Sequence, residues 1–146
     1  MNMGAHAYNQ YQKTTVETVS PGKLLIMLYD GALKNINHAI TAIDENDYNS
    51  AHNNIIKTQD IIVELMSTLN MDYDISKNLY SLYDFMLSRL IDANIDKDTG
   101  KLKELALFVQ DLRDTWQKAV QDMSSNPANR LNLANRPQMT NISLKG

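Results

Sequence analysis

The chain has 146 residues and no cysteine, and 43% of its residues are hydrophobic, which is typical of one globular domain. The lack of cysteine excludes disulfides, thiolate zinc sites and cysteine nucleophiles, and it suits a reducing, cytoplasmic compartment. The net charge is −3, but residues 1–123 carry −6, so binding to a nucleic-acid backbone is not expected. No apolar run reaches the roughly 18 residues of a membrane span, and the start lacks the features of a secretory signal. Membrane insertion is therefore not expected either.

Residues 1–19 are polar and small, with a few scattered larger side chains, and we predict that they form a loosely attached arm. A helix start follows at Ser20, because a serine hydroxyl can accept from free backbone N–H groups. Pro21 suits the first helical position, where no backbone N–H is needed.

Four segments then carry the helical period of apolar residues. They cover about residues 21–44, 48–70, 75–94 and 99–124. Asp47, Asp74 and Asp98 stand in the short acidic turns and are predicted to cap the helices that follow. Short loops between long helices favour antiparallel neighbours. The sequence therefore predicts an all-α protein, an antiparallel up-down four-helix bundle over residues 20–124.

The helical pattern stops near the C-terminus. Residues 125–146 are rich in asparagine and contain Pro127 and Pro137, which interrupt helices. We predict a flexible, disordered tail there.

A search for reactive sites finds little. His6, His38 and His52 lie in different segments, and no Glu-x-x-His pair of the kind found in di-iron bundles is present. A calcium loop starting at Asn94 would need glycine at its sixth position and glutamate at its twelfth, and neither is present. No phosphate-binding glycine loop or nucleophile elbow occurs. We predict no enzymatic activity, no metal and no cofactor.

The helices carry more apolar residues than the core stripes alone. Ile56, Val63 and Met66 share one face of the second helix, distinct from the face of its core residues. Because each helix of a bundle touches two neighbours, these extra residues could also complete the core. The alternative is an exposed apolar groove that binds a peptide. The candidate groove residues are Ile56, Val63, Met66, Leu24, Tyr83 and Leu87.

Six short strings follow one another along the chain. They are YNQYQ (8–12), SPGKLLIMLYDGAL (20–33), IKTQDIIVEL (56–65), NLYSLYD (78–84), RLIDAN (89–94) and LRDTW (112–116). Together and in this order they resemble the FliS family of flagellar export chaperones. One departure is Thr58, where the family more often has alanine. Its hydroxyl can be accommodated by a hydrogen bond to the preceding turn.

The resemblance implies a cytoplasmic chaperone that binds the disordered C-terminal segment of flagellin and prevents its premature polymerisation. It also implies delivery of flagellin to the flagellar type III export apparatus, and it leaves open whether other flagellar regulators share the binding surface. Tyr8 and Tyr11 would anchor an arm that covers part of that surface in the free protein. The tail is longer than the family pattern, and its sparse apolar residues could visit the groove. The alternative function is a helical adaptor that docks on a folded partner.

Overall fold

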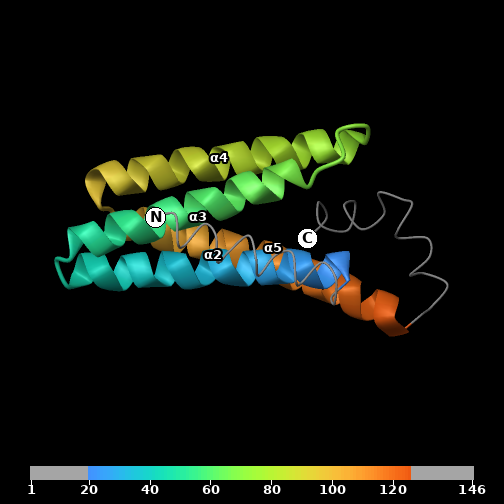
Figure 1. Ribbon diagram of the computed structural model, residues 1–146, viewed down its shortest axis with the longest axis horizontal. Helices are drawn as coiled ribbons and strands as arrows, with labels where there is room; N and C mark the ends of the chain where they lie inside the picture. The colour runs from blue at the N-terminus through green and yellow to red at the C-terminus, as the bar shows by residue number, and fades with distance from the viewer. Residues whose placement is uncertain (1–19, 126–146) are drawn as a thin grey trace.

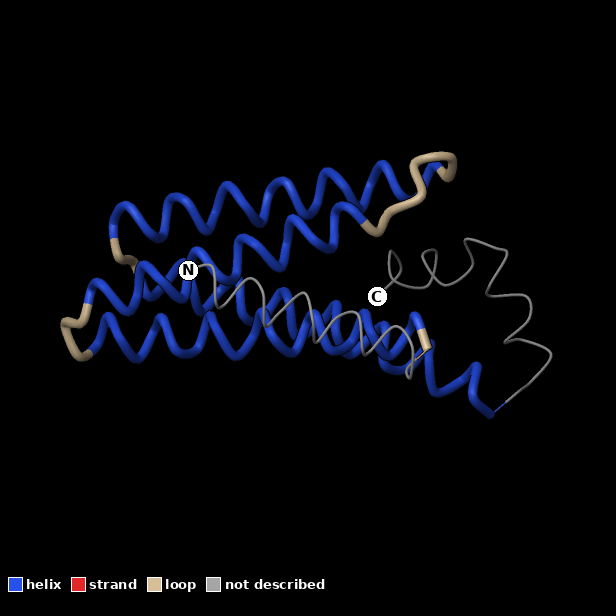
Figure 2. Tube along the Cα trace, in the orientation of Figure 1, coloured by secondary structure: helices blue, strands red, loops and turns tan. Residues whose placement is uncertain are grey.

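The computed structural model describes residues 20–125, with side chains to residue 122. It contains four helices: α2 (Pro21–Asp44), α3 (Tyr48–Ser67), α4 (Asp74–Asp96) and α5 (Thr99–Ser125). No strand occurs in this described part. The α2–α3 and α4–α5 turns lie at one end of the bundle and the α3–α4 connection lies at the other (Figure 2). Successive helices therefore run antiparallel, and the predicted all-α, up-down four-helix bundle is confirmed. The predicted arm (1–19) and residues 126–146 of the predicted tail lie outside the described residues.

Local capping explains where most of the helices begin. The Ser20 hydroxyl accepts a hydrogen bond from the Lys23 backbone N–H at 3.3 Å. A carboxylate oxygen of Asp47 accepts from the Ser50 N–H at 3.1 Å, and one of Asp98 accepts from the Lys101 N–H at 3.2 Å. These three predicted caps are confirmed.

The predictions for the α3–α4 connection were less accurate. Asp74 is not a cap: α4 begins with Asp74 itself, after Tyr73, whose side chain makes no capping bond. Asp74 instead places a negative charge in the first turn, where the helix dipole favours it. Helix α3 ends at Ser67 and not near residue 70, because the N–H groups of Thr68 and Leu69 bond to carbonyls only three residues back.

The four helices form a ring around one core. Helix α2 packs against α3 and α5, and α4 closes the ring by packing against α3 and, less extensively, α5 (Figure 1). The core contains apolar side chains from all four helices. Its fully enclosed members include Ile36, Ile55, Ile62, Leu79, Met86, Leu90, Leu102 and Val109. Within the described residues, no helix combines the length and the apolar composition needed to cross a membrane.

A buried polar chain crosses the core from α5 to α4. The Trp116 indole N–H donates to the Tyr29 hydroxyl at 3.1 Å, and this hydroxyl lies 2.6 Å from that of Tyr83. Burial is the main reason why the pKa of Tyr83 rises to about 12. Burial, with the neighbouring Tyr83 second, raises the pKa of Tyr29 well above its usual value. Both phenols therefore stay neutral at physiological pH and link helices that are diagonal in the ring.

Candidate partner-binding surface

One side of α3 carries a stripe of mainly apolar residues outside the core. Its members follow each other at alternating steps of four and three residues, the spacing of one helical face. They are His52, Ile56, Gln59, Val63 and Met66. Val63 is 53% exposed, whereas Ile56 and Met66 are half-buried. Only Gln59 interrupts the apolar run from Ile56 to Met66.

Helix α4 carries a matching stripe with the same alternating spacing. Its members are Tyr80, Asp84, Leu87, Ile91 and Asn94. Tyr80 is 45% exposed and Ile91 is 49% exposed, and Leu87 is half-buried and packed against the core. Asp84 is the only charged residue in the stripe.

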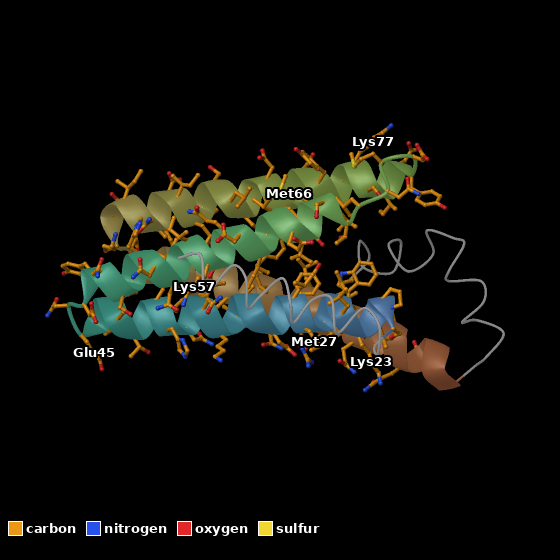
Figure 3. The ribbon with its side chains drawn as sticks, viewed as in Figure 1. Lys23, Met27, Glu45, Lys57, Met66 and Lys77 are labelled. Atoms are coloured by element: carbon orange, nitrogen blue, oxygen red, sulfur yellow. The ribbon has the colours of Figure 1, made fainter. Side chains whose placement is uncertain are left out.

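A hydrogen bond shows that the two stripes flank the same seam. The side-chain amide of Asn94 lies 2.9 Å from His52 Nδ1, joining the C-terminal part of α4 to the N-terminal part of α3. Because the helices are antiparallel, each step forward along α3 from His52 matches a step back along α4 from Asn94. This register places Met66 level with Tyr80 at the other end. In Figure 3, Met66 is labelled between the ribbons of α3 and α4.

We call the six apolar residues of this seam the α3–α4 surface. They are Ile56, Val63, Met66, Tyr80, Leu87 and Ile91. Three of them are about half exposed and the other three are partly covered. Contiguous exposed apolar side chains of this kind mark binding sites more often than scattered single ones do.

The negative charge of the bundle is concentrated on the same two helices. Residues 48–96, which cover α3, α4 and their connection, contain seven acidic and three basic residues, a net charge of −4. Helix α2 has two acidic and two basic residues, and α5 has four of each, so both are neutral. No basic side chain of the described part pairs with Asp60, Asp84 or Asp92. The α3–α4 surface is therefore apolar within an acidic surrounding.

The structure groups four of the six predicted groove residues and separates the other two. Ile56, Val63, Met66 and Leu87 belong to the α3–α4 surface. Tyr83 is only 1% exposed, because its ring lies in the core and its hydroxyl bonds to Tyr29.

Leu24 is half-buried on α2. It lies two turns from Gly31, and Gly31 is close to Ile61 of α3. Leu24 therefore lies next to the side of α3 that is turned away from the seam. We therefore leave Leu24 and Tyr83 out of the surface. The predicted arm anchors Tyr8 and Tyr11 lie outside the described residues.

The groove predicted from the sequence did not include Tyr80 and Ile91. Their spacing from Leu87, seven and four residues, was the available signal. It was not decisive, because which side of α4 faces solvent depends on how the helix packs.

The described residues include His38, His52 and the segment tested as a calcium loop. No three of their histidine and acidic side chains gather as a metal site. In the segment tested as a calcium loop, Asp98 caps α5, and Lys97 bonds through its Nζ to the backbone carbonyl and side chain of Asn94, both at 2.7 Å. The α3–α4 surface is suited to binding. Its apolar side chains provide area that a ligand can bury, and the surrounding carboxylates favour a ligand with cationic groups.

An apolar seam that the described residues leave exposed on a helical bundle is typical of proteins that bind other polypeptides. A family model described as "Flagellar protein FliS" matches residues 4–123. A Bacillus subtilis protein named flagellar secretion chaperone FliS is 45% identical over 114 residues, covering 78% of this chain and 86% of the relative. A Vibrio cholerae protein of the same name is 30% identical over 114 residues, covering 74% and 84%. The chain belongs to the FliS family of flagellar secretion chaperones.

Proposed function

We propose that this protein is a cytoplasmic chaperone that binds the disordered C-terminal segment of flagellin on the α3–α4 surface. The observation that carries the proposal is the pair of facing apolar stripes in a member of this family. By occupying the flagellin segment, the protein prevents premature polymerisation. It then delivers flagellin to the flagellar type III export apparatus.

The physical basis is coupled folding and binding. A disordered segment loses conformational entropy when it docks, and burial of apolar area must exceed that cost. A flagellin segment that forms a helix can place its own apolar stripe against the seam, since helices in grooves use the same three- and four-residue spacing. The half-exposed side chains of Val63, Tyr80 and Ile91 supply the area that remains to be buried.

The test is calorimetric titration of the full chain with a peptide of the flagellin C-terminal segment from the same organism, together with circular dichroism. We expect saturable binding, a negative heat-capacity change and a gain of helix. The double variant Val63→Ser/Ile91→Ser should weaken binding about 30-fold. About half of each side chain remains to be buried, worth roughly 1 kcal/mol each, and about 1.4 kcal/mol corresponds to a factor of ten.

The matched control is Leu107→Ser. Leu107 is 70% exposed on α5, outside the seam, so its replacement should leave the affinity within about twofold. Equal weakening by the control would place the peptide elsewhere on the bundle. An intact protein that binds no peptide would refute the flagellin proposal and direct the search to folded partners.

A further inference from the structure

From the charge distribution, the apolar seam and the exit point of α5, we infer that the C-terminal segment of this chain, residues 126–146, docks on its own α3–α4 surface. The inferred site does not depend on flagellin. Its regulatory consequence, competition with the partner, rests on the proposed function.

Charge complementarity selects this occupant. Residues 126–146 contain Arg130, Arg136 and Lys145 and no acidic residue, a net charge of +3. The described residues 20–125 contain sixteen acidic and ten basic residues, a net charge of −6, and residues 48–96 account for −4 of it. The cationic segment is thus attracted to the helices that flank the seam and not to the neutral α2 and α5.

The segment also starts at a suitable end of the bundle, close to one end of the α3–α4 surface. The ion pair of Arg89 with Glu104, at 3.4 Å, sets the register of α4 and α5 and places Ala119 level with Asp74. Helix α5 therefore continues to Ser125 about 9 Å beyond the start of α4, at 1.5 Å per residue. This is the end of the bundle where Met66 and Tyr80 begin the surface.

The reach of the segment is sufficient. Twenty-one residues can span up to about 70 Å when extended, whereas the surface is only about 15 Å long, ten residues of helix. The segment carries apolar side chains that could cover the seam. They are Leu131, Leu133, Met139, Ile142 and Leu144. Tethering gives the segment an effective concentration in the millimolar range, so weak contacts are enough for occupancy.

Docking of the segment on the α3–α4 surface would weaken the binding of a competing partner. If the segment covers the surface nine-tenths of the time, the apparent affinity for a competing partner falls about tenfold. The free surface would thereby be protected from non-specific contacts, and a partner would have to displace the segment.

The test is paramagnetic relaxation enhancement in the full chain. The protein has no cysteine, so Ser143→Cys gives a single site for a nitroxide label within the segment. We expect strong broadening of amide signals around Val63 and Ile91, and much weaker broadening around Lys34 on α2. The triple variant Arg130→Glu/Arg136→Glu/Lys145→Glu, with the same label, should abolish the broadening while leaving the bundle spectrum unchanged.

Three results would overturn the inference: no broadening on the bundle, broadening spread evenly over all four helices, or broadening unchanged by charge reversal. A mixture of labelled protein with isotopically enriched, unlabelled protein tests for a second copy. Broadening across molecules would show an intermolecular contact and also refute the inference. Because no flagellin is present, failure here is distinct from failure of the proposed function, which the peptide titration decides.

Discussion

Replacing Tyr29 and Tyr83 by phenylalanine, singly and together, tests the polar chain that crosses the core. An indole N–H can only donate, so Tyr29 accepts from Trp116 and shares one bond with Tyr83. Among the described residues no further acceptor serves these two hydroxyls, so one hydroxyl hydrogen is left over in the wild type.

The three variants differ in how many donors they leave unsatisfied. Tyr83→Phe removes one bond and still leaves one hydroxyl hydrogen, so it should cost about 1 kcal/mol. Tyr29→Phe removes both bonds and leaves the Trp116 N–H and the Tyr83 hydroxyl unpaired. It should lower the free energy of unfolding by about 3 kcal/mol, since each buried unpaired donor costs roughly 1–3 kcal/mol. The double variant leaves only the Trp116 N–H unpaired and should cost about 2 kcal/mol.

The expected signature is a reversal of sign. Tyr83→Phe destabilises the wild-type protein but stabilises the Tyr29→Phe variant, because there it removes an orphaned hydroxyl. The assay is urea unfolding followed by circular dichroism, since fluorescence of Trp116 would itself respond to the changes. Additive costs, with the double variant near 4 kcal/mol, would refute the hydrogen-bond reasoning and reduce the effect to ring packing.

Two further predictions concern the same fold. Because burial raises the pKa of Tyr29 and Tyr83 above the unfolded value of about 10, the stability that their neutral forms contribute is fully present below pH 10 and is lost as the pH rises. For Tyr83 this loss extends to about pH 12. Each tyrosine contributes about 1.4 kcal/mol per pH unit to that loss, so urea midpoints of the double phenylalanine variant should fall less steeply there, and an equal slope would contradict the assignment. Gly22→Ala would place a methyl group 2.6 Å from Val120 Cγ2 and should cost about 1–3 kcal/mol in urea unfolding. Adding Val120→Ala should restore part of that loss, whereas a further additive loss would show that the close approach is not the cause.

The sequence by itself determined the helices and the family. Ser20, Asp47 and Asp98 were identified as caps because a cap is a contact within three residues, and the same local logic placed the four helical segments. The hydrogen bond of the Thr58 hydroxyl to the preceding turn was also predicted correctly. Its acceptor, the Asn54 carbonyl at 2.9 Å, is only one turn away. The connection between α3 and α4 was less predictable because no strong cap fixes Tyr73, and α3 tightens before its periodic pattern ends.

Only the tertiary structure decided which apolar residues form a surface. Tyr80 and Tyr83 are three residues apart on one helix and are the same residue type, yet one is 45% exposed and the other 1% exposed. Tyr83 faces the core, where its hydroxyl lies 2.6 Å from that of Tyr29, 54 positions earlier in the chain. Likewise, the helical wheel could group Leu24 with Val63, but packing puts them on different sides of α3. A helical period fixes which residues share a face, and the rotation of each helix against its neighbours fixes which face meets solvent.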